Sequence, residues 1–134
     1  MDFVLKEQNG FSYIDEGEGE VLLLLHGLMG ALSNWDETVN YFKPNYRVII
    51  PMLPIYDLPL LTTGVKSVSK FVHKFVKYKK LKDFTIIGNS LGGMIAIEIA
   101  KLIPVKRPSL FQVLKTSTKR HGIFRCSVHS LFIN

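Results

Sequence analysis

The fold of this chain is decided by the stretch Phe84-Thr85-Ile86-Ile87-Gly88-Asn89-Ser90-Leu91-Gly92-Gly93. Its first four residues, 84–87, are rich in aromatic and β-branched side chains and predict a strand buried on both faces, as in a parallel sheet covered by helices. The apolar run 91–103 follows and predicts an interior helix. The glycines on either side of Ser90 permit a tight turn that lets the two backbones pass. Such a turn presents the serine hydroxyl beside a helix N-terminus, so Ser90 is a candidate nucleophile.

A second Gly-rich loop follows an earlier buried strand. The aliphatic run 21–25 leads directly into His26-Gly27-Leu28-Met29-Gly30. Glycines in such a loop let a backbone N–H point into a site. We expect the N–H groups of Leu28 and Leu91 to face a common point, where they would bind a developing oxyanion.

The other elements alternate in the way that is typical of a parallel sheet with right-handed crossovers. The helix at 65–80 is predicted from apolar residues that recur on one face with lysines between them. The start of the helix at 34–42 has the shape of a capping box. The fold class is therefore α/β, with mainly parallel strands and flanking helices. Strands are expected at 11–15, 21–25, 47–50 and 84–87, and helices at 34–42, 65–80 and 91–103.

The excess of positive over negative charge lies entirely in the last quarter of the chain. The 134 residues carry a formal net charge of +6, yet residues 1–100 hold 10 of the 17 Lys/Arg and all 11 Asp/Glu. After Pro104 the alternation of elements stops, and the best candidate for a further strand, Leu110–Leu114, is interrupted by Gln112. We therefore divide the chain into a domain at 1–104 and an atypical basic tail at 105–134, which we expect to be irregular.

Composition excludes several classes of protein. The hydrophobic content of 47% is that of a globular domain, and the single cysteine, Cys126, excludes an internal disulfide. No aliphatic run approaches the roughly 20 residues of a membrane span, and the first residues predict no signal peptide, so we expect a cytoplasmic protein. No dinucleotide or phosphate-loop motif is present, and we expect neither a cofactor nor a metal. The oligomeric state stays open.

Four motifs together resemble the α/β-hydrolase fold family. They are Tyr13-Ile14-Asp15-Glu16-Gly17, Leu25-His26-Gly27-Leu28-Met29-Gly30, Asn34-Trp35 and Gly88-Asn89-Ser90-Leu91-Gly92-Gly93. The resemblance covers residues 10 to about 104, the N-terminal half of such a fold. The residues around the serine are similar to those of the esterase and carbon–carbon-bond hydrolase branches. The resemblance implies a small-molecule, ester-like substrate. One departure is the stretch 51–57, which replaces a Gly-rich loop of many relatives.

The resemblance also implies further strands, a cap region, and a triad acid and histidine that follow the serine in the chain. The one carboxylate after Ser90 is Glu98, about 12 Å away along the helix. His121 and His129 follow in the basic tail without an acid. His26 precedes the serine, and we expect it to have a structural role. The acid and the base of the triad are therefore not identified.

Three functions stay open. The first is a serine hydrolase acting on an ester or related acyl compound, truncated and catalytically incomplete, because a serine hydroxyl needs a base and an acid to act. The second is a non-catalytic remnant whose residues after about 104 are translated out of frame. The third is a binding protein whose basic tail meets nucleic acid or lipid head groups, although nothing in the tail indicates specific nucleic-acid reading.

Overall fold

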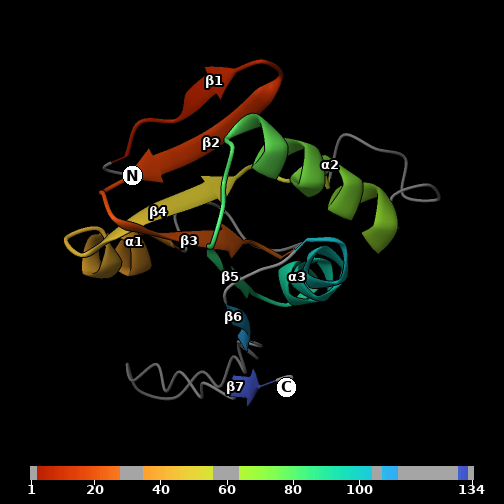
Figure 1. Cartoon of the computed structure of the whole chain (residues 1–134). Helices are drawn as coiled ribbons and strands as arrows, with labels where there is room; N and C mark the ends of the chain where they lie inside the picture. Colours follow the sequence, from red (N-terminus) through yellow and green to blue (C-terminus); the bar gives the residue numbers. More distant parts are fainter. Residues whose placement is uncertain (1–2, 28–34, 56–63, 104–106, 112–129, 133–134) are drawn as a thin grey trace, which may run out of the picture.

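The computed structural model describes residues 3–27, 35–55, 64–103, 107–111 and 130–132 (Figure 1). Within these residues, strands and helices alternate along most of the chain. The order is β1 (Lys6–Gln8), β2 (Phe11–Glu16), β3 (Glu20–Leu25), α1 (Asp36–Phe42), β4 (Tyr46–Pro51), α2 (Val65–Tyr78), β5 (Thr85–Gly88), α3 (Leu91–Leu102), β6 (Arg107–Phe111) and β7 (Ser130–Phe132).

The described strands form one seven-stranded sheet in the order β1-β2-β4-β3-β5-β6-β7. Its centre is parallel, since β3 pairs in parallel with both β4 and β5, and β5 pairs in parallel with β6. The pairs β1–β2, β2–β4 and β6–β7 are antiparallel, so the sheet is mixed. The register places Leu25 opposite Gly88, which brings the loop after β3 beside the turn after β5.

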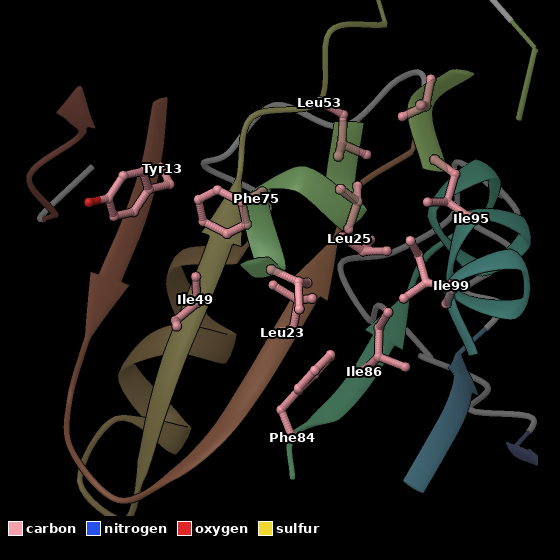
Figure 2. Close-up of a cluster of buried hydrophobic side chains, with 14 of the residues drawn as sticks. Tyr13, Leu23, Leu25, Ile49, Leu53, Phe75, Phe84, Ile86, Ile95 and Ile99 are labelled. Atoms are coloured by element: carbon pink, nitrogen blue, oxygen red, sulfur yellow. The ribbon is translucent and has the colours of Figure 1, made fainter. Parts of the chain in front are cut away.

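Alternate side chains of the buried strands point to opposite faces of the sheet. Leu23 and Leu25 of β3 belong to the core under α2 and α3, whereas Leu22 and Leu24 belong to a second core that includes Val39 of α1. Figure 2 shows the first of these cores, with side chains of the sheet directed at those of the two helices. The molecule thus has three layers, and this explains why β3 is aliphatic from Val21 to Leu25.

The predicted central elements are confirmed, with ends that shift by one or two residues. The predicted parallel pairing of 21–25 with 84–87 is also confirmed. The strand β1 was not predicted, because Lys6–Gln8 is polar and exposed. Helix α1 begins at Asp36, with Trp35 at its N-cap and no side-chain cap. The other residues of the expected capping box, 33–34, lie outside the described ranges.

Two short strands lie in the part of the chain that the sequence assigns to an irregular tail. The candidate strand Leu110–Leu114 was wrong in its bounds, since β6 spans Arg107–Phe111 and lies parallel to β5. The error arose because Arg107-Pro108-Ser109 has no aliphatic residue. The strand β7 pairs with β6. The residues between them, 112–129, lie outside the described ranges.

Candidate active site

The turn between β5 and α3 holds Ser90 in a conformation that side chains rarely adopt. Its φ is +55° and its ψ is −120°, and it occupies the N-cap of α3 without making a side-chain cap hydrogen bond. Left-handed φ values are costly for residues other than glycine, and such strain gathers at functional sites. Ser90 is also exposed, in contrast to the buried strand that precedes it. The turn therefore presents the serine hydroxyl to solvent.

The glycines around Ser90 are required by close backbone contacts. A methyl group on Gly88 would collide with the carbonyl of Gly92, and one on Gly92 would collide with the carbonyl of Leu25. The same Gly92 methyl would lie 2.8 Å from the carbonyl oxygen of His26. The glycines thus let strand, turn and helix pack more closely than any side chain would permit.

Hydrogen bonds fix the turn to the neighbouring strand. The N–H of Asn89 donates to the carbonyl of Leu25 (3.0 Å), at the end of β3. The carbonyls of Asn89 and Ser90 accept from the N–H groups of Gly92 and Gly93 (2.9 Å each). The amide oxygen of the Asn89 side chain is buried without a partner. Sequence reasoning did not single out this side chain, because its neighbours become known only once the turn is built.

The two Gly-rich loops meet at the serine. A methyl group on Gly27 would lie 3.1 Å from Cβ and 3.6 Å from Oγ of Ser90. Leu91 is the first residue of α3, directly after the serine. Leu28 lies outside the described residues. The predicted pairing of the Leu28 and Leu91 N–H groups at one point therefore stays a prediction, although Gly27, the residue before Leu28, lies beside Ser90.

His26 is buried (5% exposed) and both of its ring nitrogens have backbone partners. Its Nε2 accepts a hydrogen bond from the N–H of Leu53 (2.9 Å), and its Nδ1 lies 3.1 Å from the carbonyl oxygen of Gly27. Burial lowers the pKa of His26, and the Gly27 carbonyl partly opposes this shift. A ring so engaged has no nitrogen left to accept the proton of Ser90, which agrees with the structural role expected from the sequence.

The described residues do not place a triad acid beside the serine. Glu98 lies two turns along α3, where its carboxylate accepts a hydrogen bond from Lys101 (2.7 Å). The most engaged acid is Asp15 on β2, which is held by Arg47 and Lys79. His121 and His129, the sequence's late histidines, lie outside the described residues.

The described part of the chain lacks both a metal-binding cluster and a membrane-spanning helix. No cluster of three or more His, Cys, Asp or Glu side chains gathers there in a way that could hold a metal ion. None of the helices described has the length and apolar character needed to cross a membrane.

Comparison with known proteins establishes the family. The model of the alpha/beta hydrolase fold matches residues 20–109, so the chain belongs to this family. A solved α/β-hydrolase enzyme from the metagenome of sediments from the lagoon of Mar Chica, Morocco, is 39% identical. It superimposes with a TM-score of 0.73 over 84% of this chain and 54% of its own. An esterase from a marine microorganism is 30% identical, with a TM-score of 0.64 over 75% of this chain and 40% of its own.

Among curated proteins, the magnesium-chelatase 30 kDa subunit of Rhodobacter capsulatus is 34% identical over 100 residues. The match covers 70% of this chain and 35% of that subunit. The chain thus spans about a third to a half of the length of these relatives. The expected family and the partial α/β-hydrolase sheet are confirmed.

Proposed function

We propose that Ser90 is the nucleophile of a serine hydrolase that acts on a small-molecule ester or a related acyl compound. The observation that carries this proposal is the strained, exposed serine between a buried strand and the N-terminus of α3. Similarity to an enzyme described as an esterase supports the ester as the substrate class.

The chemistry follows from the geometry of the turn. The Ser90 hydroxyl would attack the acyl carbonyl and lose its proton to a base, and the alcohol would leave as the acyl-serine forms. Water would then release the acid and restore the serine. The negative charge of each tetrahedral intermediate would be stabilised by the N–H groups of Leu91 and Leu28 and by the N-terminal end of α3.

We further propose that this 134-residue chain is catalytically incomplete by itself. Beyond Ser90 the sequence offers Glu98 as its one carboxylate, and Lys101 engages it on the surface of α3. An oxyanion hole alone leaves activity orders of magnitude below that of a full triad. A non-catalytic role is the second candidate, and the same absence of an acid favours it.

Covalent labelling with a fluorophosphonate tests the role of Ser90. We expect slow modification that peptide mapping assigns to Ser90, and no modification of a Ser90→Ala variant. The matched control is Ser69→Ala, since Ser69 is buried in α2 with its hydroxyl bonded to the Val65 carbonyl. Equal labelling of wild type and Ser90→Ala would overturn the assignment. Complete absence of labelling in a folded wild type would favour the non-catalytic candidate.

The oxyanion hole has its own test. The backbone nitrogens of Leu28 and Leu91 should lie within about 6 Å of each other, because both must reach one oxygen at hydrogen-bond distance. A crystal structure of the phosphonate adduct would measure this separation directly. A larger separation, with the phosphonyl oxygen bonded elsewhere, would remove Leu28 from the proposed site.

A further inference from the structure

The side chain of His26 joins the loop after β3 to the segment after β4, and the described residues of these two segments share no backbone–backbone hydrogen bond. Leu53, which is buried and follows β4, donates its N–H to the ring Nε2 (2.9 Å). Because Nε2 accepts this bond, the ring proton resides on Nδ1, which then donates to the carbonyl of Gly27 (3.1 Å). A neutral imidazole thus bridges the segment after β4 and the loop after β3.

The Gly27 end of this bridge lies beside the proposed nucleophile. A methyl group on Gly27 would approach Ser90 Cβ to 3.1 Å, so a small movement of Gly27 would change the surroundings of the serine. We propose that His26 is a positioning residue whose neutral ring fixes Gly27 against Ser90, so that acid releases Gly27. The effect of His26 on catalysis rests on the proposed function of Ser90. The hydrogen-bonded bridge through His26 does not depend on that function.

Protonation would remove the bridge for a simple reason. A doubly protonated imidazole carries N–H groups at both nitrogens and has no acceptor left, so an N–H would face the N–H of Leu53. Both ring nitrogens of His26 face backbone groups in the described structure, the carbonyl of Gly27 and the N–H of Leu53, and Gly92 lies against the backbone carbonyl of His26; none of these groups titrates. The pKa of His26 is lowered by burial and raised by the Gly27 carbonyl, and no charged side chain contributes.

The direction of the pH effect follows from linkage. The pKa of His26 in the folded chain lies below the ordinary value of 6.5, so the released ring binds a proton more readily than the bridged one. The bridge is therefore at full strength above pH 6.5 and weakens as the pH falls from 6.5 toward the lowered pKa. Within that window, the equilibrium constant for opening should rise as the pH falls, by up to about tenfold for each pH unit, the limit for release of one proton-binding group.

Hydrogen exchange at the Leu53 amide tests the bridge, using the 134-residue chain between pH 7.5 and 5. After correction for the intrinsic exchange rate, wild-type protection at Leu53 should fall as the pH drops below 6.5, by up to about tenfold per pH unit. A His26→Gln variant keeps an acceptor near the place of Nε2 and does not titrate, so its protection should stay level. The matched control is His73→Gln on α2, which should follow the wild type.

Two results would overturn the proposal. One is an identical pH dependence in wild type and His26→Gln. The other is a Leu53 response that leaves the Gly27 and Ser90 amide resonances unmoved. If His26→Gln does not fold, ring nitrogen shifts of the wild type decide, since a proton on Nε2 at pH 7.5 would contradict the bridge. None of these readings needs ester turnover, so failure of the proposed function is distinguishable from failure of the bridge.

Discussion

The turn at Ser90 and the cluster around Asp15 lie in the same sheet and are built in opposite ways. At the turn, a serine adopts a φ of +55° and the buried amide oxygen of Asn89 has no partner. At Asp15, the carboxylate is 8% exposed and accepts hydrogen bonds from Arg47 (2.7 and 2.8 Å) and Lys79 (2.8 Å).

This contrast indicates that the Asp15 cluster stabilises the fold, whereas the turn at Ser90 is the candidate site. The Asp15 cluster joins β2 to β4 and α2, and Lys79 also lies over the Tyr13 ring, 4.6 Å from its centroid. Both carboxylate oxygens of Asp15 accept hydrogen bonds from cationic side chains, as buried polar groups in stable interiors require. The turn instead contains the strained backbone of Ser90 and the unpaired amide oxygen of Asn89, and neither feature stabilises the folded chain. Strain of this kind persists where surrounding structure enforces it and is found at functional sites.

The largest effect is expected where the strained turn is packed. A Gly92→Ala methyl would collide with the carbonyl of Leu25, so we expect a loss of about 3 kcal/mol or more in the free energy of unfolding, at the upper end for overpacking. Chemical denaturation measures this loss. The matched control is Gly64→Ala, since no atom lies within 4 Å of the added methyl. Equal stability of the two variants would show that the close packing at the turn is absent.

The next largest change in stability is expected at the Asp15 cluster. Burial alone would raise the pKa of Asp15, but hydrogen bonds from Arg47 and Lys79 outweigh it and lower the pKa from 3.8 to about 2. Asp15→Asn should therefore cost about 2 kcal/mol at neutral pH. Glu98→Gln, which breaks an exposed pair with Lys101, should cost less than about 1 kcal/mol.

The pH dependence of that cost has a definite sign. Because the folded pKa is depressed, the stabilisation by Asp15 is complete above the ordinary value of 3.8 and is lost as the pH falls through about 2. The stability curves of wild type and Asp15→Asn should therefore converge on acidification. Curves that stay parallel down to pH 2 would show that Asp15 is not held by its two cations.

The smallest expected change in the free energy of unfolding concerns Ser90, in the turn between β5 and α3. Ser90→Gly removes the side chain from a left-handed φ and should raise the free energy of unfolding by up to about 1 kcal/mol. Ser90→Ala keeps a Cβ at that φ and should change stability little. The comparison of the two variants isolates backbone strain from loss of the hydroxyl. A gain in Ser90→Ala equal to that in Ser90→Gly would place the cost in the hydroxyl instead.

Much of the central sheet could be predicted because its signals are local. The run 21–25 is aliphatic at every position, as a strand covered on both faces must be, and α2 shows a regular apolar face. The spatial order of the strands was not predicted, since β4 follows β3 in the chain yet lies on the side of β3 away from β5. Strand β6 was misplaced because its first residues carry no β-forming signal.

The sequence predicted only those parts of the candidate site that lie within a local motif. Glycines around Ser90 imply a tight turn, but the collisions that require them involve Leu25 on another strand. The partners of His26 are equally distant, since Leu53 lies 27 residues away. The Asp15 cluster unites residues 15, 47 and 79 through the sheet and α2. Such contacts arise from tertiary packing, which no pattern along the chain encodes directly.

The most direct measurement is the turnover of an activated ester, such as p-nitrophenyl acetate, by the wild-type chain and by Ser90→Ala at neutral pH. The account predicts very slow turnover and little change in the variant, because the described part of the chain places no free base within reach of Ser90 to take its proton. Turnover at rates typical of enzymes, abolished by Ser90→Ala, would contradict it. The chain would then possess an acid and a base for Ser90, and the claim of an incomplete site would be wrong.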